Sequence, residues 1–126
     1  GSREDQKGNF EIIYDCRAVG VRDYYHANPY SMYGYGDEPL YSFENLKLSH
    51  FKDQKVMIIK DSFTDTMGPF LGMGVTHLVV VDVRAFTGSV ERLIQMEKPD
   101  VVFLMYTPSF ENEINWKTHR DKFDFR

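Results

Sequence analysis

The chain has 126 residues, of which 42% are hydrophobic and 15% aromatic, and this composition predicts one globular domain rather than a disordered chain. Its net charge of −4 is spread without a basic stripe, so nucleic acid is not an expected partner. No stretch is long and apolar enough to span a bilayer. Cys16 is the only cysteine, which excludes an internal disulfide and a thiolate metal cluster.

The amino-terminal segment, residues 1–9, is interpreted as an expression scar and a polar, frayed tail, with Gly1 and Ser2 as the scar. Residues 10–126 are predicted to form a single α/β domain, which we expect to be a fragment of a longer protein. The domain begins with an alternating apolar pattern over residues 10–15 that predicts a strand. Residues 19–22 continue this strand or pair with it.

Residues 23–39 contain five tyrosines, two glycines and two prolines without a regular period, and this pattern predicts a long loop. A loop of this length in a small domain is functional or mobile. The tyrosines either line a polar ligand, because a phenol offers a stacking face and a hydrogen-bonding tip, or fold over the sheet as part of the core. Both interpretations stay open.

Short apolar runs alternate with helical patterns through the rest of the chain. Strands are predicted at residues 40–43, 56–59, 77–81 and 101–105, and helices at residues 63–71 and 89–98. From residue 56 the order is strand, helix, strand, helix, strand, which is typical of a parallel sheet covered on both faces. The tail from residue 110, with Trp116, Phe123 and Phe125, is expected to pack back on this sheet.

Asp61 and Ser62 lie just after the apolar strand at residues 56–59. They are therefore expected at the carboxyl end of this strand, which is the edge where open α/β sheets bind ligands. One interpretation is a nucleophile at a strand-to-helix turn, where backbone N–H groups can stabilise an oxyanion. The alternative is a capping box formed by Ser62 and Asp65, which satisfies helix N–H groups and requires no chemistry.

If the sheet is parallel, the carboxyl ends of its strands bring several polar residues to one edge. A pocket is expected there and is lined by Asp61, Ser62, Asp82, Arg84, Tyr106 and Thr107.

Four segments together resemble one family: Val56 to Phe63, Met67 to Leu71, Val79 to Phe86 and Lys98 to Tyr106. They resemble the SGNH-hydrolase-like superfamily, in its DHHW and alginate O-acetyltransferase branch, over about residues 36–106. The resemblance implies a flavodoxin-like three-layer α/β/α fold with a short, mostly parallel sheet, expected to be incomplete here. It also implies ester chemistry, as an O-acetyltransferase or acetylesterase acting on cell-envelope polysaccharide, and an extracytoplasmic location.

The resemblance implies that Ser62 is the nucleophile and that Asp61 is the acidic neighbour that fixes the turn. Lys60 stands where the wider superfamily commonly has glycine. Asp82 and Arg84 match a recurring strand-end motif, for which Arg84 is the substrate-binding candidate and a structural role is the alternative. The later Gly and Asn blocks of the superfamily, which help to form the oxyanion hole, have no counterpart in this chain.

A serine nucleophile needs a base, usually a histidine oriented by a carboxylate. In the resembling acetyltransferases this pair lies on the amino-terminal side of the serine. Asp23 and His26 have the D-x-x-H spacing, so either they form the dyad or the base lies in a segment upstream of this chain. Of the other histidines, His50 and His119 are expected in solvent, and His77 is expected at the opposite edge of the sheet.

Two further functions compete with the serine enzyme. The first is a non-catalytic carbohydrate-binding or scaffold module that uses the tyrosine loop. The second is a phospho-receiver, which Asp61 and Asp82 suggest but which lacks clustered carboxylates for Mg²⁺. No metal-binding motif and no glycine-rich phosphate loop is present, so we expect neither a metal nor a cofactor. The acceptor glycan, the acetyl donor and the oligomeric state are not determined by the sequence.

Overall fold

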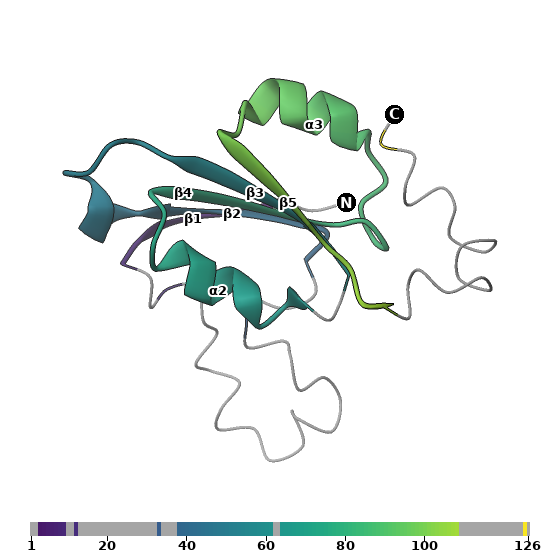
Figure 1. Cartoon of the computed structure of the whole chain (residues 1–126), viewed down its shortest axis with the longest axis horizontal. Coiled ribbons are helices and arrows are strands. Elements are labelled where there is room, and N and C mark those ends of the chain that lie inside the picture. Colours follow the sequence, from purple (N-terminus) through teal and green to yellow (C-terminus); the bar gives the residue numbers. More distant parts are fainter. Residues whose placement is uncertain are drawn as a thin grey trace, which may run out of the picture.

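The computed structural model describes residues 3–9, 12, 33, 38–61, 64–108 and 125, and it forms a sheet with helices on both sides (Figure 1). The strands are β1 (Arg3–Gly8), β2 (Leu40–Asn45), β3 (Lys55–Lys60), β4 (His77–Asp82) and β5 (Val101–Met105). The helices are η3 (Leu46–Leu48), a single 3₁₀ turn, and the α-helices α2 (Met67–Gly72) and α3 (Val90–Glu97).

The sheet has the strand order β1-β2-β4-β3-β5. Strands β4, β3 and β5 are parallel, while β2 runs antiparallel to β4 and β1 runs parallel to β2. The predicted strand at residues 56–59 is therefore an interior strand of a mostly parallel sheet. Its apolar run is buried because neighbouring strands cover both of its edges and helices cover its faces.

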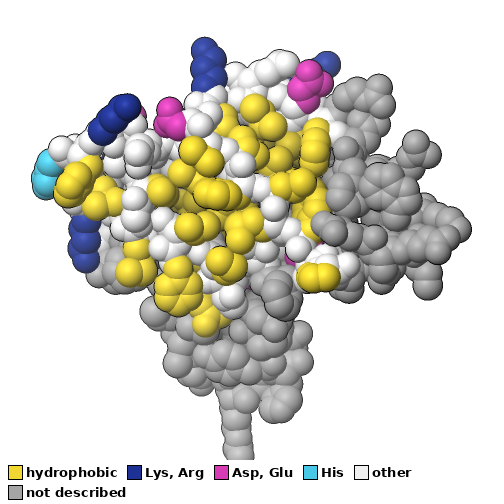
Figure 2. All heavy atoms as spheres, in the orientation of Figure 1, with side chains coloured by type: hydrophobic (Ala, Val, Ile, Leu, Met, Phe, Trp, Pro, Cys, Tyr) yellow, Lys and Arg dark blue, Asp and Glu magenta, His cyan; other side chains and the backbone are white. Residues whose placement is uncertain are grey.

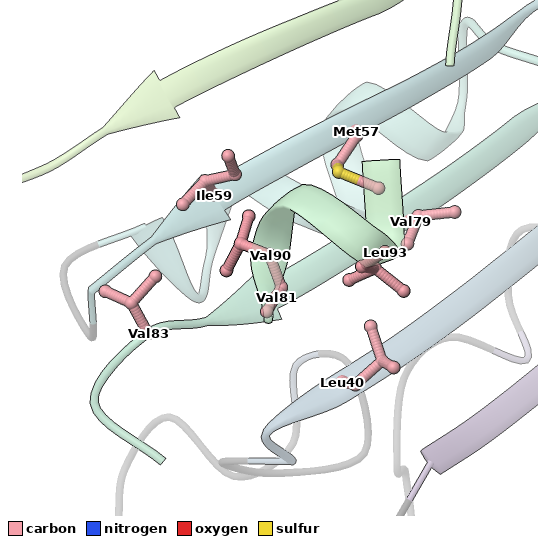
Figure 3. Packing of buried hydrophobic residues seen from close by; sticks show 8 residues of the cluster. All are labelled: Leu40, Met57, Ile59, Val79, Val81, Val83, Val90 and Leu93. Atoms are coloured by element: carbon pink, nitrogen blue, oxygen red, sulfur yellow. The ribbon is translucent and has the colours of Figure 1, made fainter. Parts of the chain in front are cut away.

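One face of the sheet packs against α3 (Figure 3). Val90 and Leu93 of this helix contact a buried cluster formed by alternate residues of the strands, namely Leu40, Met57, Ile59, Val79 and Val81. The helix begins as predicted, since the Ser89 hydroxyl accepts the Arg92 N–H at 3.1 Å. It ends at Lys98, which adopts the left-handed conformation.

The other face packs against α2 over Tyr41, Phe43, Leu78 and Val80, which completes the three-layer α/β/α arrangement. This helix begins at Met67, four residues after the predicted start at Phe63. Its N-cap Thr66 makes no side-chain capping bond. The capping-box interpretation of Ser62 and Asp65 is therefore wrong as to the helix start, because neither residue precedes the first turn of α2 directly.

The prediction of a frayed tail at residues 3–9 is also wrong, because residues 3–8 form β1. The strand is polar and lies at the sheet edge, so no apolar periodicity reveals it. Backbone pairing with β2 holds it, together with the ion pairs Arg3–Glu97 at 2.6 Å and Lys7–Glu44 at 2.8 Å. Of the strand predicted at residues 10–15, the structure describes Ile12, which lies in a turn with its N–H bonded to the Asn9 carbonyl.

Strand β5 departs from the expectation that both faces of the sheet are covered. Val101, Val102, Phe103 and Leu104 are between 40% and 52% exposed, although they continue the apolar register of β3. Met67 and Phe70 of α2 are also exposed, and Figure 2 shows apolar side chains gathered across this side of the molecule. That the fold is incomplete in this chain stays a prediction.

The described parts of the two remaining segments are short. Phe125 packs against the α3 core cluster and its carbonyl accepts the Glu91 N–H at 2.6 Å, so the tail returns to the sheet at this residue. Of the tyrosine loop the structure describes Tyr33, Glu38 and Pro39, and both interpretations of this loop remain predictions. No described helix has the length and apolarity needed to cross a membrane.

The close approach of α2 to β2 depends on Gly68, because a Cβ atom at this position would collide with the Tyr41 hydroxyl. The Gly68→Ala substitution should lower the free energy of unfolding by about 1–3 kcal/mol in urea denaturation, although alanine favours helices. Gly74→Ala, where a Cβ meets only the Leu71 carbonyl at 3.9 Å, is the control and should change it little. In a Tyr41→Phe background, which lacks the hydroxyl, Gly68→Ala should lower the free energy of unfolding by less. An equally large decrease in both backgrounds would show that the Tyr41 hydroxyl is not the cause.

Candidate functional site

The candidate site lies at the edge of the sheet where β3, β4 and β5 end. Ser62 lies outside the described residues, so the site is built from the residues before and after it, which the structure describes up to Asp61 and again from Thr64. The parallel register aligns Lys60 of β3 with Asp82 of β4 and with Met105 of β5. The ends of three strands therefore meet beside the turn that contains the predicted nucleophile.

Lys60 is the centre of this edge. Its side chain is only 2% exposed, and its ammonium forms ion pairs with Asp65 and, at 3.0 Å, with Asp82. Both carboxylates are as deeply buried as the lysine. Because an unpaired charge in the protein interior is strongly disfavoured, these groups hold one another in place. The ammonium thus links the end of β3 to β4 and to the chain just beyond Ser62.

Asp82 has a second cation in Arg84. The Arg84 Nε donates to Asp82 Oδ1 at 2.9 Å, and the Arg84 backbone N–H donates to the same oxygen at 2.9 Å. Burial opposes the ionisation of Asp82, but the hydrogen bonds from Arg84 and the charge of Lys60 outweigh it, so the pKa of Asp82 is lowered. Asp82 is therefore a structural anion at neutral pH.

Asp61 and Thr64 attach the turn to the end of β5. The Asp61 carboxylate accepts the Thr107 N–H at 2.7 Å and the Thr107 hydroxyl at 2.9 Å. The Thr64 hydroxyl donates to the Met105 carbonyl at 3.0 Å. The chain is therefore fixed to β5 immediately before Ser62 and again two residues after it.

Tyr106 lies among these acidic groups and also packs against the core. Burial raises the pKa of Tyr106, and the negative charges of Asp61 and Asp82 raise it further. The phenol therefore keeps its proton at physiological pH. It is suited to donating a hydrogen bond at this edge and unsuited to acting as a base.

The structure brings together five of the six residues predicted at this edge, and the sixth, Ser62, lies outside the described part. It separates His77 from them, as predicted, because His77 begins β4 at the opposite edge and bonds Asp53 at 2.9 Å. Asp23, His26 and His119 are not among the described residues, so the predicted dyad stays untested. No cluster of His, Cys, Asp and Glu suited to a metal ion occurs among the residues that the structure describes.

Sequence reasoning did not identify the Lys60 network. It treated Lys60 as a departure from the family pattern and Asp65 as a helix cap, whereas the two side chains form a buried ion pair. A signal was present, because Lys60 is a cation at the end of an interior apolar strand. Such a residue needs a buried carboxylate, and Asp65 and Asp82 were candidates at the same edge.

Comparison with solved structures gives several similar folds. Bacillus cereus PatB1 matches with a TM-score of 0.61 and 24% identity over 77% of this chain and 29% of that chain. PatB1 with a sulfonyl adduct matches with a TM-score of 0.60 and 23% identity over 77% of this chain and 31% of that chain. A DHHW family protein from Eubacterium siraeum matches with a TM-score of 0.58 and 25% identity over 75% of this chain and 30% of that chain.

This chain therefore has a fold of the DHHW and PatB type and spans less than a third of the length of each of these proteins. No protein-family model and no curated protein matches it.

Replacing Lys60 by methionine leaves the Asp65 carboxylate buried without this cation. Lys60→Met should lower the free energy of unfolding by about 3–5 kcal/mol in urea denaturation. The matched control is Lys55→Met at the other end of β3, where the lysine is one-third exposed and pairs with Glu97 at 3.1 Å. That change should cost at most about 1 kcal/mol. Equal losses in the two variants would contradict a dominant role for the buried pair.

The lowered pKa of Asp82 predicts acid sensitivity. A carboxyl whose pKa is lower in the folded chain stabilises the fold fully above its unfolded pKa of about 4 and loses this contribution as the pH falls through the folded pKa. Asp82→Asn should therefore be less stable than the parent at pH 6 and show a weaker loss of stability towards pH 2. Urea denaturation at several pH values between 2 and 6 measures the free energy of unfolding of both proteins. If this free energy falls equally with pH in the two proteins, Asp82 is not the source of the acid sensitivity.

Proposed function

We propose that this chain carries the serine-bearing part of a serine-dependent O-acetyltransferase or acetylesterase that acts on cell-envelope polysaccharide, with Ser62 as the nucleophile. The observation that carries the proposal is the pair of hydrogen bonds that anchor the chain on either side of Ser62. The Asp61 carboxylate accepts the Thr107 N–H, and the Thr64 hydroxyl donates to the Met105 carbonyl. A nucleophile benefits from a backbone that is held in one geometry, because misplacement by about 1 Å can cost about 100-fold in rate. The extracytoplasmic location implied by the resemblance belongs to the same proposal.

The similar structures support the same chemistry. One of the PatB1 structures contains a sulfonyl adduct. The DHHW family protein agrees with the family that the sequence motifs resemble. Both likenesses are to proteins more than three times as long as the aligned region, so the activity of the whole protein is part of the proposal.

In the proposed reaction the Ser62 Oγ attacks the acetyl carbonyl carbon of the donor and loses its proton to a base. The tetrahedral intermediate collapses with departure of the alcohol of the donor, which takes up a proton, and an acetyl-serine remains. A sugar hydroxyl then attacks this ester in a transferase, or water attacks it in an esterase. The base is His26 oriented by Asp23, or a histidine on a segment upstream of this chain.

Arg84 is the proposed substrate-binding residue. Its side chain is 37% exposed while it remains bonded to Asp82, so it is fixed at the edge of the site with part of its surface accessible. A guanidinium held in this way can donate to the hydroxyl or carbonyl oxygens of an acetylated sugar. The buried Asp82 orients it, which reduces the entropy lost when a substrate binds.

A second candidate is a carbohydrate-binding module without catalysis. One observation favours it: neither of the two histidines among the described residues lies near Ser62. His77 begins β4 at the opposite edge of the sheet, and His50 follows β2, whose last residues pair with the start of β4 at that same edge. In this case the tyrosine loop binds the glycan. Binding would then survive Ser62→Ala and be lost when Tyr33 and Tyr35 are replaced.

The purified chain is tested with a small chromogenic acetyl ester and with an aryl sulfonyl fluoride, each beside Ser62→Ala. We expect stoichiometric sulfonylation at Ser62 by mass spectrometry, none in Ser62→Ala, and ester turnover that needs Ser62 wherever the base lies within the chain. Labelling without turnover supports a base on another segment. If the folded chain is not labelled at Ser62 but binds acetylated glycan, the enzyme proposal is wrong and the binding-module proposal is supported.

A further inference from the structure

Strand β5 lies at the edge of the sheet but has the sequence of an interior strand. Its five residues, Val101–Met105, are all apolar. The register with β3 places Val102 and Leu104 on the α3 side of the sheet and Phe103 on the α2 side. Apolar side chains on both faces are typical of a strand in the middle of a sheet. In the described part of the chain, however, β5 pairs with β3 and no strand pairs with its other edge.

Neither helix covers β5. Among the described residues, the strand residues buried beneath α3 and α2 come from β2, β3 and β4, and only Met105 of β5 packs at the margin of one cluster. Residues 101–104 keep between 40% and 52% of their surface exposed, whereas residues 56–59 of the neighbouring β3 are at most 7% exposed. The apolar interior therefore continues to the outside of the molecule at β5, where burial of this surface would be favourable.

The two edges of the sheet differ in their side chains. Strand β1 at the other edge carries four charged residues, namely Arg3, Glu4, Asp5 and Lys7. Charged side chains on an edge strand oppose pairing with another chain, because pairing would take them out of water. Strand β5 has neither a charged residue nor a proline. Its open edge is therefore suited to pairing with a further strand, and the edge of β1 is not.

The apolar surface extends from β5 to α2. Met67 and Phe70 of α2 are 46% and 61% exposed, and Figure 2 shows apolar side chains gathered over this side of the molecule. The charged side chains that Figure 2 shows lie mostly around this patch rather than within it. An apolar centre with a polar rim is the composition of a protein–protein interface. The surface therefore fits a protein partner that is apolar where it meets β5.

We propose that the open edge of β5 binds β5 of a second copy of this chain, so that two sheets join through an antiparallel pair of strands. A twofold axis at such an edge pairs identical strands in opposite directions, and the register that pairs all five residues is centred on Phe103. This register places Phe103 opposite the partner's Phe103 and Val102 opposite the partner's Leu104. Every direct pair is then apolar and lies on one face of the joined sheet, without opposed like charges.

The pairing brings the partner close to the candidate site. The carboxyl end of β5 belongs to that edge, because the Met105 carbonyl accepts the Thr64 hydroxyl and Thr107 bonds Asp61. In the centred register Met105 lies opposite the partner's Val101. Each candidate site therefore borders the partner subunit, although the inference does not depend on the proposed role of Ser62.

The contact between the two copies is small. A pair of five-residue strands buries less than the roughly 800 Å² per partner of a typical specific interface. The dimer is therefore expected to be reversible, with a population that rises with concentration.

Sedimentation equilibrium over a range of concentrations tests the pairing, and we expect the parent chain to dimerise. Phe103→Lys and Phe103→Glu each place two like charges opposite one another, so each should weaken the dimer at least about 100-fold. An equimolar mixture of the two variants places opposite charges together and should restore dimers. Met96→Lys on α3, where Met96 is 74% exposed, is the control and should dimerise like the parent.

A parent chain that stays monomeric at every concentration would overturn the inference and leave the edge of β5 to a partner other than this chain. Dimers that persist in Phe103→Lys and Phe103→Glu would overturn it as well, because they would have to form elsewhere. Restored dimers in the mixture cannot result from unfolding of the single variants, so this arm separates loss of pairing from loss of the fold.

A cysteine cross-link keeps the test decisive if the charged variants do not fold. Phe103→Cys is made in a chain whose single cysteine, Cys16, is replaced by serine. Directly opposed residues of an antiparallel pair have Cα atoms about 4.5–5.5 Å apart, which a disulfide can span. Mild oxidation should therefore link most of the Phe103→Cys chains into dimers. Met96→Cys in the same background is more exposed and should link few, and equal linking at the two positions would overturn the inference.

Discussion

The buried ammonium of Lys60 is the interaction on which the candidate site depends. It lies at the end of the interior strand β3, where two neighbouring strands also end, and it holds carboxylates from β4 and from the following turn. In an apolar interior these charges tolerate little displacement, because separating them leaves each one desolvated and unpaired. The edge of the sheet is therefore rigid at the point where the chain leaves it towards Ser62.

The two edges of the sheet use charge differently. At the opposite edge, Lys55 of β3 forms a partly exposed ion pair with Glu97 at the end of α3, and the Arg3 side chain of β1 reaches the same carboxylate. Such pairs contribute little each and are screened by salt. At the candidate site the charges are buried, so they define geometry strongly. The same sheet thus has a solvated edge that tolerates change and a buried edge that does not.

The proposed chemistry also needs a base, and the described residues do not provide one near the turn. A strand-end serine with fixed flanks gives position but not proton transfer, which requires a group such as imidazole within hydrogen-bonding reach. Strand β5, with its exposed apolar side chains, borders the same edge through Met105 and Thr107. The described part of the chain therefore presents one component of the proposed site, namely the anchored residues on either side of Ser62.

The sequence by itself determined the α/β class, the strands β2 to β5, helix α3 with its Ser89 cap, and the shared edge of Asp61, Asp82 and Thr107. These features follow from apolar periodicity and local capping, which act between near neighbours in the chain. The tertiary structure alone decided that residues 3–8 form an edge strand, that α2 begins at Met67, and that Lys60 pairs with Asp65 and Asp82. Polar edge pairing and the choice of partner for a buried charge depend on which distant segments meet in space, and no local pattern encodes that.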